Sequence, residues 1–348
     1  MSDLPSHTQV LIIGGGIVGC SVAYHLTKLG CSDVVLLEQG QLSCGTTWHA
    51  AGLVGQLRAT QNQTELAKYT RDLYLSLEEE TGLATGYRST GSISVARTPE
   101  REEELKRQAG MAAAFGVDVE RLSFKDAKEK APLLNTDDLV AAYLIPSDGM
   151  TNPTDTTQAL ARGARNGGTK IFEGVKVSEI LTHEGRAIGA KTDKGRIEAE
   201  VVVVCAGMWT RELCAPLGVD VPLHAAEHYY IVTRPIEGVL RNQPVLRDMD
   251  GYIYIKEEVG GLVLGGFEPH AKPWGMEGIP DGFEFQALPE DWDQFEVFMN
   301  TGLERIPALA EAEIRQLFVG PESFTPDNRY ILGEAPDLRR LYVAAGFN

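Results

Sequence analysis

The chain has 348 residues, a formal net charge of −17, 43% hydrophobic residues and 23% charged residues. It is long enough for two folded domains, and its acidity argues against nucleic acid or an anionic membrane as a main partner. No apolar run approaches the roughly 20 residues of a membrane span, and the N-terminus has no signal or transit pattern, so we expect a cytoplasmic protein.

The five cysteines form no Cys-x-x-Cys pair and no zinc-type cluster with the histidines, so we expect reduced thiols and no metal site. The first predicted elements form a compact unit of about 30 residues, the size of a βαβ unit. It consists of a buried strand at Gln9–Ile13, a helix over Gly16–Leu29 and a second strand at Asp33–Leu37.

A glycine motif, Gly14-x-Gly16-x-x-Gly19, follows the first strand and opens the helix. Such glycines let the backbone approach a pyrophosphate, which binds the free N–H groups at the helix start. Glu38 ends the second strand, where an acid accepts hydrogen bonds from ribose hydroxyls. The unit therefore predicts a bound dinucleotide. Its candidate residues are Gly14, Gly16, Ile17, Val18, Gly19, Glu38 and Gln39.

Four further helices are predicted from capping signals and apolar periodicity: one over Asn62–Thr81, one starting at Thr98-Pro99, one starting at Ser123, and one from Asn152-Pro153 to Asn166. A fifth is expected over Asp291–Gly302. The predicted strands that follow residue 175 are Lys176–Leu181, Ile188–Thr192, Arg196–Glu200, Val201–Cys205, Glu227–Arg234, Tyr252–Glu257, Gly261–Phe267 and Leu341–Ala345.

The first and last apolar strands both read as members of one parallel sheet, so we predict two interleaved domains of a mixed α/β fold. A Rossmann-like dinucleotide domain is expected from residues 1–85, 150–215 and 320–348. An antiparallel-sheet substrate domain is expected from residues 86–149 and 216–319.

The segment Gly45-Thr46-Thr47-Trp48-His49-Ala50-Ala51-Gly52-Leu53 resembles the flavin segment of sarcosine and dimethylglycine dehydrogenases, which belong to the glycine/D-amino-acid oxidase superfamily. The resemblance implies FAD as the cofactor, bonded covalently to His49 through the flavin 8α-methyl carbon. The alternative is a core histidine beside non-covalent FAD. The cofactor residues that it implies are Gly45, Thr46, Thr47, His49, Gly52, Leu53, Val177, Ala206, Gly207 and Gly346.

The resemblance extends over nearly the whole chain. The matching blocks are Glu78–Gly82, Pro132–Asn135, Cys205–Trp209 and Gly320–Asp327. Family members continue beyond Gly346-Phe347-Asn348 into a glycine-rich turn and helix that face the flavin. This branch also carries a C-terminal folate-binding domain. We expect both parts to lie outside this sequence, and tetrahydrofolate to be a partner of a longer form.

On the substrate side, His228, Tyr230 and Val232 share one face of a predicted strand, and Tyr252 and Tyr254 share a face of the next. By resemblance, His228 and Tyr254 match a catalytic His/Tyr pair that lines the amine pocket and helps the substrate lose its proton. The alternative is a structural role for both as half-buried sheet residues.

Tyr252 and Arg247 are the candidate substrate-binding residues. The Arg247 guanidinium can pair with a substrate carboxylate, or with Asp248 or Asp250 at the surface.

The resemblance thus implies an FAD-dependent dehydrogenase that oxidises an N-methyl glycine by hydride transfer, with loss of the methyl group. Sarcosine and dimethylglycine are not distinguished, and the electron acceptor is open. Two alternatives remain. One is an oxidase that uses oxygen. The other is a non-catalytic regulator, because Thr90–Ser94 and Pro222–His228 also resemble the regulatory subunit of pyruvate dehydrogenase phosphatase.

Overall fold

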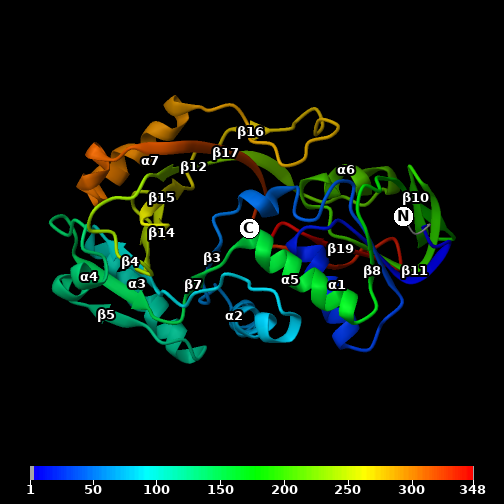
Figure 1. Cartoon of the computed structure of the whole chain (residues 1–348), viewed down its shortest axis with the longest axis horizontal. Helices are drawn as coiled ribbons and strands as arrows, with labels where there is room; N and C mark the ends of the chain where they lie inside the picture. Colours follow the sequence, from blue (N-terminus) through cyan, green and yellow to red (C-terminus); the bar gives the residue numbers. More distant parts are fainter. Residues whose placement is uncertain (1–3, 348) are drawn as a thin grey trace.

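The computed structural model describes residues 4–347 of the chain. Two lobes, each built on its own sheet, lie side by side, and two long strands arch from one lobe toward the other (Figure 1). Residues 1–3 and 348, which belong to the predicted dinucleotide domain, lie outside the described residues. The predicted mixed α/β fold is confirmed.

The sheet of the first lobe has the strand order β18-β19-β11-β1-β2-β8. All neighbours along this path pair in parallel except β18, which pairs antiparallel with β19. β10 and β9 extend β11 as an antiparallel meander. The strands are β1 (His7–Ile13), β2 (Val34–Leu37), β8 (Lys170–Phe172), β9 (Val177–His183), β10 (Arg186–Thr192), β11 (Gly195–Val204), β18 (Ile331–Glu334) and β19 (Leu341–Ala345).

One prediction in this lobe is wrong. The strands expected at Arg196–Glu200 and Val201–Cys205 are one continuous strand, β11. Its first part pairs with both β10 and β1, and its second part pairs with β1 and β19. Polar and apolar residues alternate in the first part of β11, whereas the second part is entirely apolar. The two patterns differ because the two parts of the strand have different neighbours.

The two faces of this sheet are covered by different layers. Val10, Ile12 and Leu36 pack with α1 (Ile17–Lys28) and α5 (Pro153–Asn166), and α2 (Gln61–Thr81) packs outside α5. Leu11 and Ile13, which point the opposite way, pack with Ile180 and Ile197 of the meander. The fully apolar strands that the sequence shows are thus explained, because both faces are buried.

The helix boundaries follow from capping. The Thr60 hydroxyl accepts a hydrogen bond from Gln63 N, and α2 ends at Gly82 in the left-handed conformation (φ 72°). The Asn152 side chain accepts from the first backbone amides of α5, which begins with a proline. These signals are readable in the sequence, which is why the helices were predicted well.

The second lobe contains a nine-stranded sheet with the order β16-β12-β15-β14-β13-β4-β6-β5, and β17 pairs with β12 outside this path. The strands are β4 (Ser92–Ala96), β5 (Glu120–Leu122), β6 (Ala141–Ile145), β12 (His224–Thr233), β13 (Val245–Asp248), β14 (Ile253–Glu258), β15 (Gly261–Gly266), β16 (Pro273–Trp274) and β17 (Ile314–Phe324). The helices of this lobe are α3 (Pro99–Ala114), α4 (Phe124–Lys130), α7 (Trp292–Arg305) and the short η4 (Pro307–Glu311).

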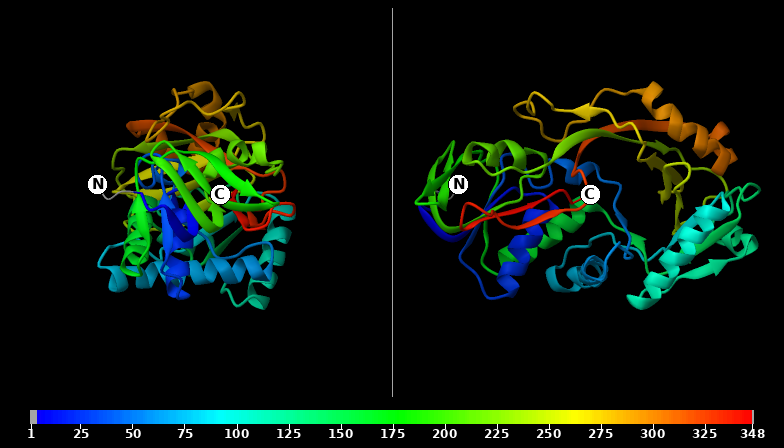
Figure 2. Two further views of the ribbon diagram at one scale, coloured as in Figure 1. Left: turned by 90° about the vertical axis from the view of Figure 1, so that its right-hand side faces the viewer. Right: turned by 180° about the vertical axis from the view of Figure 1, so that it is seen from behind.

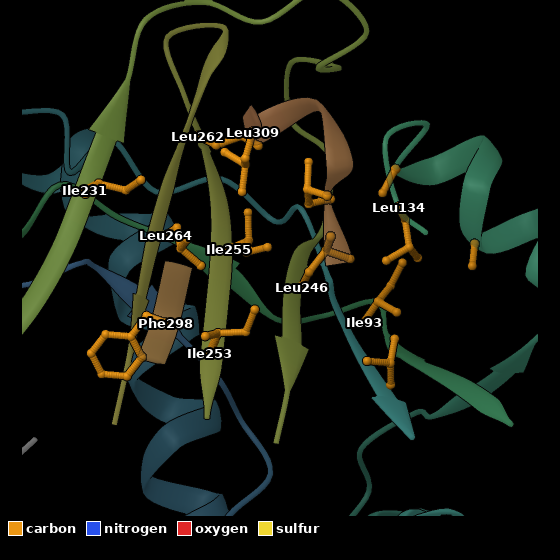
Figure 3. Close-up of a cluster of buried hydrophobic side chains, with 14 of the residues drawn as sticks. Ile93, Leu134, Ile231, Leu246, Ile253, Ile255, Leu262, Leu264, Phe298 and Leu309 are labelled. Carbon is orange, nitrogen blue, oxygen red and sulfur yellow. The ribbon is translucent and has the colours of Figure 1, made fainter. Parts of the chain in front are cut away.

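One face of this sheet forms the core of the second lobe (Figure 3). Alternate residues of its strands, including Ile231, Ile253, Ile255 and Leu264, pack with Phe298 of α7 in this cluster. Because side chains alternate along a strand, the residues between them, among them Tyr230 and Tyr254, lie on the opposite face of the sheet. That face carries the candidate substrate residues.

The lobes are joined by β12 and β17, which pair from His224↔Phe324 to Thr233↔Ile314 (Figure 2). A small two-stranded sheet, β3 (Leu53–Val54) with β7 (Gly149–Met150), lies at the junction. Between β11 and β12 the chain forms η2 (Gly207–Trp209), α6 (Thr210–Cys214) and η3 (Ala215–Leu217). The domain limit predicted at residue 320 falls inside β17.

Candidate active site

The glycine motif forms a tight turn between β1 and α1. Gly14 has φ 111°, and a side chain there would place its Cβ 2.3 Å from the carbonyl oxygen of Cys205. A Cβ on Gly19 would lie 1.9 Å from the carbonyl oxygen of Gly14. These two glycines are therefore required by packing, whereas Gly16 caps α1 in an extended conformation.

A cavity of about 560 Å³ adjoins this turn. Most residues predicted to contact the cofactor line it: Gly14, Gly16, Ile17, Val18, Glu38, Gln39, Gly45, Thr46, Thr47, Val177, Ala206, Gly207 and Gly346. Gly19, His49, Gly52 and Leu53 do not line it. Gly52 (φ 73°) packs against the backbone of Thr151, and Leu53 lies in the junction sheet.

Glu38 is an acidic side chain held against the glycine turn. It is 7% exposed, and its carboxylate accepts hydrogen bonds from Gly15 N (2.6 Å) and Gly40 N (2.9 Å). Burial raises its pKa, and the two backbone amides act in the opposite direction. The amides orient the carboxylate at the cavity wall, where its remaining lone pairs can accept from hydroxyl groups.

His49 ends the short helix η1 (Thr46–His49) and is 5% exposed. Its ring stacks on Phe318, with 5.4 Å between centroids, and meets Trp48 edge-on. Nε2 is buried and has no hydrogen-bond partner among the described residues. Burial lowers the pKa of His49 to about 4, so the imidazole is neutral at pH 7 and one of its nitrogens keeps a free lone pair.

Gly320 of β17 makes room for this imidazole. A Cβ at residue 320 would lie 2.7 Å from Cε1 and from Nδ1 of His49. Two hydrogen bonds hold η1 in place: Ile17 N donates to Thr47 Oγ1, and Thr46 Oγ1 donates to the carbonyl of Pro321. The glycine turn, η1 and β17 are therefore tied together around His49.

On β12, His228 lies directly opposite Gly320. It is 8% exposed, and its Nε2 is hydrogen-bonded to the Tyr254 hydroxyl at 3.0 Å. Burial, and secondarily His49, lowers the pKa of His228 to about 4, and burial raises the pKa of Tyr254 well above its usual value. Both side chains are neutral at pH 7, and the structure brings this predicted pair together.

Gly265 explains how the pair can meet across an intervening strand. It lies between Tyr230 and Tyr254 in the sheet, and a Cβ there would be 2.5 Å from the Tyr254 hydroxyl oxygen. The absence of a side chain on β15 leaves the space through which Tyr254 reaches His228. Phe267 packs against the His228 ring at 4.7 Å.

Arg247 lies beside Tyr254 in the antiparallel pair β13–β14. Asp248 is bonded to Arg97 and Arg305, and Asp250 to Arg101, so neither is its partner. Within residues 4–347, no carboxylate lies within 4.0 Å of Arg247 in an ion pair, and its Nε is buried without a partner. The guanidinium is thus available to bind an anion from outside the chain.

The prediction for the backbone at Tyr252 is wrong. β14 begins at Ile253, and Tyr252 lies in the preceding turn with φ 61° and 46% exposure. The turn forms because Gly251 N bonds to Asp248 Oδ1. Tyr252 therefore does not lie on the same strand face as Tyr254. The large cavity is not lined by Tyr252, His228, Tyr254 or Arg247.

Glu322 and Phe318 were missed as site residues by the sequence analysis. Both lie on β17 on the same face as Gly320, and Glu322 lines the cavity. β17 itself was not predicted, because Gly320 and Pro321 interrupt its pattern. The signal that could have found Glu322 is the block Gly320–Asp327, in which no role was assigned to any side chain.

Two features that the described residues lack bear on the kind of site. Across residues 4–347, no group of three or more His, Cys, Asp or Glu side chains is placed to hold a metal ion. No helix in this described part is long and apolar enough to cross a membrane.

The chain matches the family described as FAD dependent oxidoreductase (DAO) over residues 9–348. Over 99% of its length it is 44% identical to the mouse pyruvate dehydrogenase phosphatase regulatory subunit. It is 42% identical to 4-methylaminobutanoate oxidase of Paenarthrobacter nicotinovorans and 40% identical to human sarcosine dehydrogenase, again over 99% of the chain. It spans 40%, 42% and 38% of the length of these three proteins.

Among solved structures, L-proline dehydrogenase from P. horikoshii matches with a TM-score of 0.88 and 26% identity, over 99% of this chain and 89% of that one. Glycine oxidase from Geobacillus kaustophilus matches with a TM-score of 0.82 and 26% identity, over 98% of this chain and 90% of that one. The predicted superfamily is therefore confirmed, and the chain belongs to the DAO family of FAD-dependent oxidoreductases.

Proposed function

We propose that this chain forms the flavin and substrate domains of an enzyme that oxidises the N-methyl group of an N-methyl glycine, sarcosine or dimethylglycine. The observation that carries the proposal is the buried His49 imidazole with its unpartnered Nε2, placed against Gly320 opposite the His228–Tyr254 pair. The identity to sarcosine dehydrogenase and 4-methylaminobutanoate oxidase supports an N-methyl amine as the substrate.

The residues present fit FAD. The glycine turn would hold the pyrophosphate, Glu38 would accept from the ribose hydroxyls, and Val177 would lie against the adenine. We propose that Nε2 of His49 bonds covalently to the flavin, because a neutral imidazole nitrogen without a partner is a ready nucleophile. Bound FAD supplies the oxidising chemistry, since it accepts a hydride from the N-methyl carbon.

The residues of the second sheet would bind and orient the substrate. Arg247, with no ion-pair partner among residues 4–347, would bind the substrate carboxylate in a bidentate pair. Tyr254 lies beside Arg247 and its hydroxyl is bonded to His228, and these two side chains would contact the amine. An alkyl amine has a pKa near ~10.4, so these neutral groups would favour the uncharged amine, whose lone pair is needed for oxidation.

The test uses the full-length protein purified with its flavin. Under anaerobic conditions, sarcosine, dimethylglycine and 4-methylaminobutanoate are mixed with it, and the loss of flavin absorbance is followed; glycine, which has no N-methyl group, is the control. We expect reduction by sarcosine or dimethylglycine and not by glycine. Absence of reduction by both N-methyl glycines would refute the proposal, and reduction by 4-methylaminobutanoate alone would identify a different N-methyl substrate.

The covalent bond is tested separately. Acid-precipitated protein should keep its flavin, and proteolysis should place the flavin on the peptide that contains His49. Release of all flavin into the supernatant would show that the protein binds FAD without a covalent bond. Tetrahydrofolate, as the acceptor of the one-carbon unit, belongs to this proposal for a longer form of the protein.

A second candidate is a non-catalytic regulator, which the 44% identity to the phosphatase regulatory subunit favours. A flavin that is bound but not reduced by any N-methyl amino acid would support it. An oxidase differs from a dehydrogenase in its acceptor, and formation of hydrogen peroxide during turnover in air identifies the oxidase.

A further inference from the structure

Glu322 is a carboxylate in the site, and the function proposed above gives it no role. It lies on β17 two residues beyond Gly320, and its side chain is 17% exposed. A carboxylate oxygen lies 3.8 Å from Nδ1 of His228, the ring nitrogen that does not bond Tyr254. The other side of the carboxylate borders the large cavity.

The side chains of Tyr254, His228 and Glu322 form a line of three polar groups. The Tyr254 hydroxyl and His228 Nε2 are 3.0 Å apart, and His228 Nδ1 faces Glu322. The line comes from three strands, β14, β12 and β17, whose register places Glu322 diagonally beside His228. Such a diagonal pair on one face lies within reach of long side chains.

We propose that Glu322 is the final acceptor of the proton that the substrate ammonium loses, and that His228 and Tyr254 relay this proton to it. This inference rests on the function proposed above. It assigns the acceptor role to a residue that acts through His228, so Glu322 is a positioning and proton-accepting residue rather than one that contacts the substrate.

The proton balance is as follows. The ammonium N–H bond breaks and its electron pair stays on nitrogen, while the Tyr254 oxygen takes this proton and passes its own to Nε2 of His228. Nδ1 then releases its proton to Glu322, so the imidazole ends neutral and the carboxylate becomes a carboxylic acid. A small rotation of the Glu322 side chain, or one bridging water, spans the 3.8 Å.

The local environment favours a carboxylate over the imidazole as the place where the proton rests. Burial raises the pKa of Glu322 to about 7, close to the value that serves a base at neutral pH. Burial lowers the pKa of His228 to about 4, so an imidazolium there is unfavourable. The imidazole is thus suited to pass a proton and the carboxylate to keep it.

Other titratable side chains lie around Glu322. His228 faces it from β12, and Tyr254 of β14, Tyr230 of β12 and His49 of η1 lie on the same side of the sheet; all four are neutral at pH 7. Around the wider cavity lie Glu212 of α6 and the ion pair of Lys176 with Asp281.

The experiment compares the full-length, flavin-loaded wild type with Glu322→Gln, and uses Glu311→Gln as the control, because Glu311 is an exposed carboxylate of the same lobe. Flavin reduction by the best N-methyl substrate is measured from pH 6 to pH 10. We expect Glu322→Gln to lose about a hundredfold in rate at pH 7. The loss should shrink toward pH 10, where the free amine loses its proton in solution.

A second readout does not depend on turnover. Infrared spectra taken as the pH is lowered through 7 should show a protonated carboxyl band in the wild type and in Glu311→Gln. This band should be weaker in Glu322→Gln by the contribution of one carboxyl group, while the flavin absorbance spectrum and thermal unfolding midpoint of this variant report whether it folds and holds flavin normally.

The outcomes separate the two proposals. If the wild type is reduced and Glu322→Gln keeps the wild-type rate and pH profile, or if the band keeps its full intensity in that variant, Glu322 is not the acceptor and the proposed function stands. If no N-methyl amino acid reduces the wild-type flavin, the proposed function fails and this inference fails with it.

Discussion

Gly320→Ala tests whether the position of the His49 ring is essential. The new Cβ would lie 2.7 Å from Cε1 and Nδ1, against 3.4 Å or more for ordinary contact, so the ring must shift by about 0.7 Å. Phe318 and Trp48 confine the ring, and overpacking of this kind costs about 1–3 kcal/mol. A misplacement approaching 1 Å slows a reaction between fixed groups by about a hundredfold.

The assay measures the fraction of flavin that remains with acid-precipitated protein after the purified apoprotein is incubated with FAD. Gly110→Ala is the matched control, because Gly110 lies in α3 with nothing within 4 Å of its added Cβ. We expect slow covalent incorporation in Gly320→Ala and the wild-type rate in Gly110→Ala. Wild-type incorporation in Gly320→Ala would show that the covalent bond does not depend on this ring position.

Three further predictions concern the second sheet. Gly265→Ala should destabilise the protein by about 1–3 kcal/mol in urea unfolding, because its Cβ would lie 2.5 Å from the Tyr254 hydroxyl oxygen. Arg247→Lys should raise KM for the N-methyl substrate about ten- to a hundredfold with a smaller change in kcat, as expected when a charge-assisted bidentate pair is lost; an unchanged KM would remove Arg247 from substrate binding. Burial lowers the pKa of His228 from 6.5 to about 4. The unfolded chain therefore binds a proton between these pH values that the folded protein does not, and stability falls as the pH drops from 6.5 toward 4. His228→Gln should reduce this loss by about 2 kcal/mol at pH 5, and equal losses in urea unfolding of both proteins at pH 5 and pH 7 would contradict the buried neutral state.

The sequence predicts the first lobe well because its signals are local. The glycine turn, the acid at Glu38 and the capped helices each depend on residues close together in the chain. The cavity wall also contains Ile279–Gly282 and Trp209. These segments lie far from the glycine turn in the chain, and although the block Cys205–Trp209 includes Trp209, no short motif marks Ile279–Gly282.

The second lobe was predicted less completely because its sheet is assembled from distant segments. β13, β4 and β6 follow one another in the sheet, yet β13 is about 150 residues from β4 and about 100 residues from β6 along the chain. β17 was missed because Gly320 and Pro321 weaken its strand pattern. Both residues nevertheless have a role in the site. Gly320 leaves space for the His49 ring, and the Pro321 carbonyl accepts a hydrogen bond from the Thr46 hydroxyl.

The register of β12 against β17 is what couples the two lobes at this site. With His228 opposite Gly320, the alternation of side chains places His228 and Glu322 on the face that meets His49. A slip of β12 by one residue against β17 would turn His228 to the opposite face, away from Glu322, and bring Tyr229 in its place. The hydrophobic alternation that buries Tyr229, Ile231 and Val319 in the core resists such a slip. Packing of the core face of the sheet therefore fixes which side chains lie on the opposite face, where the site is. The same packing holds Tyr254, His228 and Glu322 in line.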